Sequence, residues 1–247
     1  MCNFNRQPRT IYMRQFIAYF IFLVTILVGC NQSQNTDKTT IEDTKSELDT
    51  FYLGNKLVHV TKVEKSTFDK LPEFALKSNE SEYLLKDSST VKRTGDTLFF
   101  KISDNKKVTL INNNSDNDTY VNYSYGGLIS DLNKYLIDAT YYEWNNYLLI
   151  DPVSGDTTIT AGLPIVSPDK KTFICGNCDL LAGFTFNGIE LYSNINKPEL
   201  LSARELTKWG PTNIKWLDNS SLIVECNISD TTNANLQRQE FLKLTWK

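Results

Sequence analysis

The chain has 247 residues, of which 12% are aromatic and 22% charged, and its formal net charge is −3. This charge argues against nucleic acid as a partner, because nucleic-acid recognition requires a basic surface. The single histidine, His59, excludes any metal site or proton relay built from several histidines. Its setting among β-branched residues is typical of an ordinary strand position.

The first 29 residues have the composition of an export signal. Their only charges are Arg6, Arg9 and Arg14, and the thirteen residues 16–28 are uncharged. This apolar run is shorter than the roughly 20 residues a membrane-spanning helix needs and suits the core of a signal peptide. Met1 and Met13 are alternative starts.

The run closes on Leu27-Val28-Gly29-Cys30 and is followed by polar residues. This tetrapeptide resembles the lipobox of bacterial lipoproteins. The resemblance implies that residues 1–29 are removed and that the thiol of Cys30 is diacylated, which anchors the protein to the membrane. An ordinary secretory signal or an apolar anchor is the alternative.

The mature chain keeps 218 residues, with 23 basic and 29 acidic side chains and a net charge of −6. Residues 30–49 are polar and predict a flexible tether, which leaves residues 50–247 as the folded domain. The first acidic residue after Cys30 is Asp37. Some Gram-negative groups use acidic residues directly after the acylated cysteine for surface display. We therefore expect a cell-envelope location, at the periplasmic face of the outer membrane.

The folded part predicts one short N-terminal helix in a chain made otherwise of strands. Residues 51–63 indicate a strand, and Ser66 is a candidate cap for a helix over residues 67–76 that Pro72 limits. Strand-like apolar runs separated by polar turns then continue to the C-terminus, which predicts an all-β domain. These runs are residues 97–102, 107–111, 134–142, 147–150, 171–175, 189–192, 221–228 and 241–246.

A weak internal repeat places a polar turn before a buried strand. Residues 130–137, 167–174 and 216–223 align without gaps, with a looser match at residues 95–98. The spacing of Leu136, Phe173 and Leu222 is close to the period of a propeller blade, about 40 to 50 residues. The turn Ser167-Pro168-Asp169-Lys170-Lys171 resembles the S-P-D-x-K turn of WD-type and related bacterial β-propeller repeats.

That resemblance implies a β-propeller-like domain of about four to five small blades, in which the ring can be incomplete. We expect a strand near residues 57–60 to complete the last blade. A β-sandwich is the alternative fold. Leu136, Phe173 and Leu222 should occupy equivalent buried positions, whereas Lys134 and Lys170 should face solvent.

The chemistry-bearing residues give three candidate sites, each with a plainer alternative. Cys175 and Cys178 have C-x-x-C spacing but lack a following helix, so a structural disulfide or buried thiols are both open. Asp138, Glu143 and Asp151 lie near aromatic residues and could include a glycosidase-like pair, or be ordinary surface and turn carboxylates. The Asn-rich residues 112–118 offer oxygen ligands for calcium, or form a solvated loop.

Nucleophile elbow, zinc-protease and phosphate-loop motifs are absent from the sequence. We therefore expect a membrane-tethered binding or scaffold module without a cofactor, a metal or catalytic residues. Its recognition surface should involve residues 123–127, 141–146 and 183–188, and its partner would be a protein or a glycan. A carboxylate-dependent extracytoplasmic hydrolase is the alternative.

Overall fold

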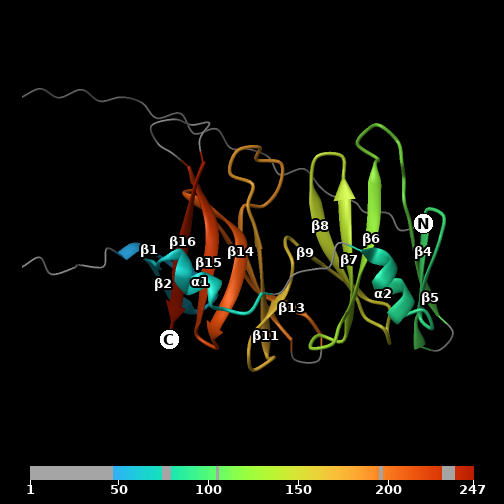
Figure 1. The fold of residues 1–247 in the computed structure, drawn as a ribbon, viewed down its shortest axis with the longest axis horizontal. Coiled ribbons are helices and arrows are strands. Elements are labelled where there is room, and N and C mark those ends of the chain that lie inside the picture. The colour runs from blue at the N-terminus through green and yellow to red at the C-terminus, as the bar shows by residue number, and fades with distance from the viewer. Residues whose placement is uncertain (1–46, 74–78, 104–105, 195–196, 230–236) are drawn as a thin grey trace, which may run out of the picture. The chain divides into compact units, whose positions relative to one another are not determined.

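The computed structural model describes residues 47–73, 79–103, 106–194, 197–229 and 237–247. Cys30, the signal segment and most of the expected tether lie outside these ranges. The described residues form sixteen strands and two short helices (Figure 1). The first strand, β1 (Glu47–Leu53), begins three residues before the expected start of the domain at residue 50. Within the described ranges, no helix is long and apolar enough to cross a membrane.

The strands form four antiparallel sheets, which confirms the all-β class. One sheet has the order β3-β4-β5, from β3 (Val91–Thr94), β4 (Thr97–Lys101) and β5 (Lys107–Ile111). The next contains β6 (Val121–Ile129), β7 (Lys134–Tyr141), β8 (Asn145–Ile150) and β9 (Thr157–Thr160), and the third β10 (Ile165–Val166), β11 (Thr172–Asn177), β12 (Gly188–Ser193) and β13 (Glu199–Glu205).

The fourth sheet joins the two ends of the domain. Its order is β1-β2-β16-β15-β14, with β2 (Lys56–Lys62), β14 (Trp209–Asp218), β15 (Ser221–Ser229) and β16 (Gln237–Trp246). Val60 of β2 lies opposite Leu244 of β16, and both side chains are fully buried. A strand near residues 57–60 therefore does complete the last sheet, as the sequence predicts.

Successive sheets pack through shared apolar clusters. Phe100 and Ile137 belong to the cluster between β3–β5 and β6–β9, and Leu149 and Phe173 to the cluster between β6–β9 and β10–β13. A third cluster joins β10–β13 to the sheet that contains β14. Its buried members include Ile174, Ile189, Leu191, Trp216, Leu222, Val224 and Leu244. None of the clusters that the described residues form combines the β3–β5 sheet with the β14-containing sheet.

The aligned residues Leu136, Phe173 and Leu222 lie in β7, β11 and β15 and are 0% exposed. Each of these strands follows the tight turn of the repeat and pairs with the strand before that turn, which lies at the edge of its sheet. The three aligned stretches thus take the same place in successive sheets.

The looser match at residues 95–98 is wrong, because β4 runs the opposite way. At the start of β4, Asp96 accepts a hydrogen bond from the amide of Asn112, whose side chain accepts one from Tyr123 near the start of β6. Beyond the end of β4, the amide of Ser103 bonds to Pro152, in the turn after β8. Strand β4 therefore runs toward the end from which β7 starts.

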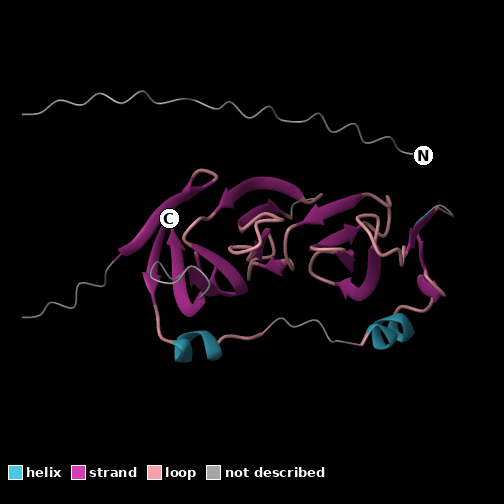
Figure 2. Ribbon diagram, turned by 90° about the horizontal axis from the view of Figure 1, so that it is seen from above, coloured by secondary structure: helices cyan, strands magenta, loops and turns pink. Residues whose placement is uncertain are grey.

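Two short helices, and not one, precede the β3–β5 sheet. Helix α1 (Lys65–Asp69) begins two residues before the expected helix and ends before Pro72, and Ser66 lies inside it because Glu64 is the N-cap residue. Helix α2 (Glu80–Lys86) was not expected from the sequence. It is capped by the Asn79 side chain, which accepts a hydrogen bond from Ser81. Figure 2 shows both helices on one side of the sheets.

Candidate functional site

The domain has two ends of different construction, and one is made by the turns of the repeat. The Lys170 ammonium lies 2.7 Å from the Asp131 carboxylate, and the Asn194 side chain donates to the carbonyls of both residues. The amide of Asp169 donates to the Asn219 side chain at 2.9 Å. We call this set, residues 130–133, 167–171 and 218–220, the turn end. Polar bonds thus tie the corresponding turns of three sheets together.

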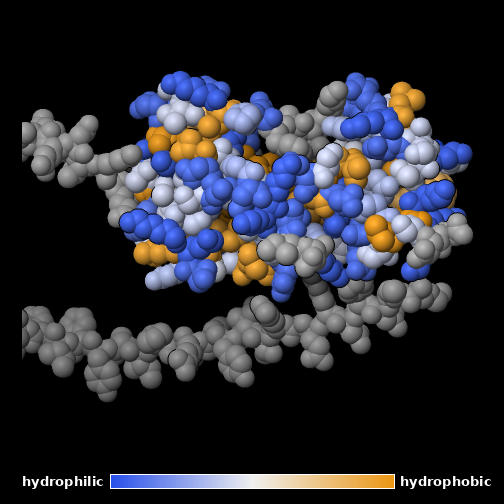
Figure 3. All heavy atoms as spheres, turned by 90° about the horizontal axis from the view of Figure 1, so that it is seen from below, coloured by the Kyte–Doolittle hydropathy of each residue, from blue (hydrophilic) through white to orange (hydrophobic). Residues whose placement is uncertain are grey.

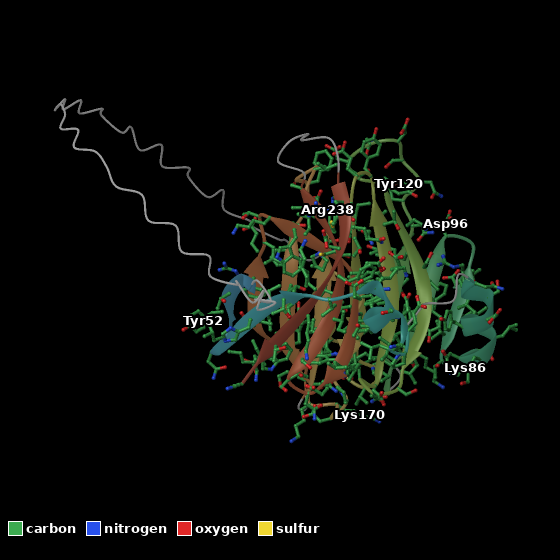
Figure 4. The ribbon with its side chains drawn as sticks, turned by 60° about the vertical axis from the view of Figure 1, so that its left-hand side comes forward. Tyr52, Lys86, Asp96, Tyr120, Lys170 and Arg238 are labelled. Carbon is green, nitrogen blue, oxygen red and sulfur yellow. The ribbon has the colours of Figure 1, made fainter. Side chains whose placement is uncertain are left out.

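In Figure 4, Lys170 at the turn end lies opposite Tyr120 and Arg238. Figure 3 shows a largely hydrophilic face with separate apolar patches. Because β7 and β11 both start at the turn end, the turn after β7 and the loop after β11 lie at the other end. We call those two segments, residues 142–144 and 178–187, the loop end.

The loop after β11 is held by two side chains. The Asp179 carboxylate accepts bonds from the amides of Gly183 at 2.9 Å and Thr185 at 2.5 Å, and from the Thr185 hydroxyl at 2.9 Å. Partial burial alone would raise the pKa of Asp179, but the bonds from Thr185 and Gly183 lower it below its ordinary value. The carboxylate therefore stays charged and fixes the loop at neutral pH.

The second anchor is Asn187, which is buried. Its side chain accepts a bond from the Asp179 amide and donates to the carbonyls of Leu206 and Trp209, at the start of β14. Leu181 and Phe184 at the loop tip are 57% and 60% exposed. The loop thus presents two apolar side chains on a backbone fixed from within, which suits a recognition element.

The turn after β7 presents aromatic side chains. The rings of Tyr141 and Trp144 stack with centroids 3.8 Å apart, and Trp144 and Tyr142 are 40% and 53% exposed. Burial raises the pKa of the hydroxyls of Tyr141 and Tyr123, which hydrogen-bond to each other. Of the three predicted recognition segments, residues 141–146 and 183–188 lie at the loop end, whereas residues 123–127 lie inside strand β6.

The three candidate carboxylates lie at different points along the β7–β8 hairpin. Asp138 lies within β7, where burial raises its pKa and its Oδ1 atom has no hydrogen-bond partner among the described residues. Glu143 lies in the turn before β8, and Asp151 follows the last residue of β8. The two are therefore separated by the length of that strand, roughly 20 Å at about 3.3 Å per residue.

Lys134 is buried, which contradicts the prediction that it faces solvent. Its ammonium lies 3.0 Å from Asp151, and its side chain is 7% exposed. Burial alone would raise the pKa of Asp151, but bonds from Ser154, Lys134 and Val153 lower it to about 2. Lys170, in contrast, is exposed as predicted.

The three described cysteines are free thiols. Cys175 is fully buried in the cluster between β6–β9 and β10–β13, where desolvation and the charge of Glu190 raise its pKa well above the ordinary value. Cys178 lies at the base of the β11–β12 loop, against Gly210 of β14 in the next sheet. The two thiols face different neighbouring sheets and are not bonded to each other in this structure.

The Asn-rich loop satisfies its polar groups internally. Asn117 accepts bonds from the amide and hydroxyl of Thr119 and from Ser115, whose amide donates to Asn113. In the described part of the chain, no three His, Cys, Asp or Glu side chains are grouped to hold a metal ion. His59 lies on the exposed side of β2.

No known protein family matches the chain, and no curated protein or solved structure matches it. Sequence reasoning missed Asp179 and Asn187 as the anchors of the loop. The sequence did contain a signal for these anchors, because polar side chains flank the apolar residues 180–183. These side chains are Asn177, Asp179 and Asn187, and such residues commonly hydrogen-bond to nearby backbone.

Proposed function

We propose that the protein is a lipid-anchored binding module of the bacterial cell envelope. Its propeller-like domain would stand off the membrane on the tether that follows acylated Cys30. Four antiparallel sheets packed in succession, with the last completed by the N-terminal hairpin, support a propeller-like partial ring. The β3–β5 sheet has three strands, whereas the other sheets have four or five, and helix α2 packs against β3 and β6 beside it.

The observation that carries the binding role is the fixed β11–β12 loop with exposed Leu181 and Phe184. When the backbone that holds exposed apolar side chains is already ordered, binding a partner through them loses little conformational entropy. We propose a protein partner that covers these two side chains. The length of β8 that separates Glu143 from Asp151 gives no support to a hydrolase that uses these two carboxylates as a pair.

The test compares crosslinked capture from the native envelope by the wild type, by Leu181→Ser with Phe184→Ser, and by Ile111→Ser. Ile111 is 61% exposed on edge strand β5 and serves as the matched control. A specific partner should be recovered by the wild type and the control but not by the loop variant. Equal recovery by all three would contradict the proposal. In the same cells, a fatty-acid label should follow the protein and be absent from Cys30→Ala.

A further inference from the structure

Cys178 is pressed against strand β14 of the neighbouring sheet. A Cβ atom placed on Gly210 would lie 2.6 Å from the Cys178 Sγ and 3.0 Å from its Cα, so only glycine allows this approach. The Cys178 thiol also accepts a hydrogen bond from the backbone of Asn227 in β15. Asn227 pairs with Gly210 across the β14–β15 ladder and directly follows Cys226.

Cys226 is fully buried and belongs to the apolar cluster that joins the β10–β13 sheet to the β14-containing sheet. It therefore faces the sheet from which Cys178 extends. Burial comes first among the causes that raise the pKa of Cys226 to about 12, and the charge of Glu240 and then of Cys178 add to it. Cys178 packs on Gly210, whose ladder partner Asn227 adjoins Cys226, so the two thiols lie in the same interface between these two sheets.

We propose that Cys178 and Cys226 are a redox pair that forms a disulfide between the base of the β11–β12 loop and strand β15. The Cys178 thiolate attacks a small-molecule disulfide, and one thiol leaves. The Cys226 sulfur then attacks the mixed disulfide at Cys178, and the second thiol leaves. The two cysteines lose two protons and two electrons, and the oxidant takes them up as two thiols.

The exposure of the two cysteines determines which one reacts first with the external disulfide. Cys178 is half-buried and Cys226 is buried, so an external disulfide reaches Cys178 first. Cys175 cannot replace either one, because it faces the β6–β9 sheet on the other side of β11. Burial raises the pKa of the Cys178 thiol above its ordinary value. Since the thiolate is the nucleophile, the rate of oxidation should rise as the pH increases above neutral.

The disulfide would cross-link two sheets at the point where the loop leaves β11. Oxidation would then add a covalent link at the base of the loop that presents Leu181 and Phe184, which Asn187 already holds by hydrogen bonds, and reduction would remove that link. The bond itself does not depend on the proposed binding role. The pair can be present in a protein whose loop binds nothing, so the two proposals fail separately.

The full chain is treated with oxidised glutathione, alkylated, and mapped by mass spectrometry without reduction. The thiols of Cys178 and Cys226 should be lost, and one cross-linked peptide should join these two residues. Cys175→Ser should give the same cross-link, whereas Cys226→Ser should stop at a glutathione adduct on Cys178. A bridge from Cys178 to Cys175, retention of both thiols, or an adduct on Cys178 that persists in the wild type would each overturn the proposal.

Discussion

Lys134 and Asp151 form an ion pair at the junction of β7 and the β8–β9 turn, with N to O distance 3.0 Å. The ammonium is also near the carbonyls of Leu132 and Asn133, so its donors have acceptors within the protein. The sequence could not reveal this burial, because a lysine at the start of a strand is usually exposed. Lys134 meets Asp151 only because β7 and β8 pair in the folded sheet.

We expect Lys134→Met to lower the free energy of unfolding by about 3 kcal/mol, because it leaves the Asp151 carboxylate without its partner in a partly buried site. Lys170→Met removes an exposed ion pair and should cost less than about 1 kcal/mol. Denaturant unfolding at neutral pH measures both. Equal losses would show that the Lys134 pair contributes no more than a surface contact.

The same pair predicts an acid dependence. The pKa of Asp151 is depressed from 3.8 to about 2, so its contribution to stability is present above 3.8 and is lost as the pH falls toward 2. The Lys134→Met variant lacks the ion pair, so protonation of Asp151 should cost it less stability than it costs the wild type. The difference in stability between the two proteins should therefore shrink over that range.

At the scale of elements, the three aligned second strands provide the repeated unit of the core. Leu136, Phe173 and Leu222 are each 0% exposed at the same place in successive sheets. Each truncation to Ala should cost about 2 to 5 kcal/mol, since it removes buried apolar contacts and leaves a cavity. Leu200→Ala on edge strand β13, where the side chain is 49% exposed, is the control and should be near neutral.

The elements that the sequence predicted are those whose apolar residues alternate next to clear turns. Strand β6 was missed because Tyr123, Tyr125 and Gly127 suggested a loop, and the structure has a β-bulge there, with Gly127 at φ 93°. Helix α2 was missed because it has no fully buried residue and therefore no apolar periodicity. It is held instead by Glu80, which pairs with Arg93 and accepts a bond from the Tyr125 amide.

The sequence was sufficient to predict which segments form the candidate site, but not the contacts that hold them. The aromatic turn and the β11–β12 loop were identified from composition, whereas their fixed geometry comes from bonds between side chains and distant backbone. The Cys178 and Cys226 pair joins residues from different sheets. Only the packing of β11 on β14 brings them together, and no local pattern encodes that contact.

At the scale of the whole domain, the sheet that contains β14 ties the N-terminal hairpin to the C-terminal strand. Val60 and Leu244 are register partners in this sheet and belong to the same buried cluster. If the two ends form one cooperative unit, loss of either side chain should loosen the contacts of the other. The energetic effects of the two truncations should then not be additive.

We expect Val60→Ala and Leu244→Ala each to lower the free energy of unfolding by about 2 kcal/mol or more, because both side chains are fully buried. The double variant should lose less than the sum, by about 0.5 kcal/mol or more, as is usual for residues in contact. Val60→Ala combined with Leu136→Ala, which lies in a different cluster, is the control and should be additive. Additive losses in the first pair would indicate that the β2–β16 contact does not couple the two ends of the chain.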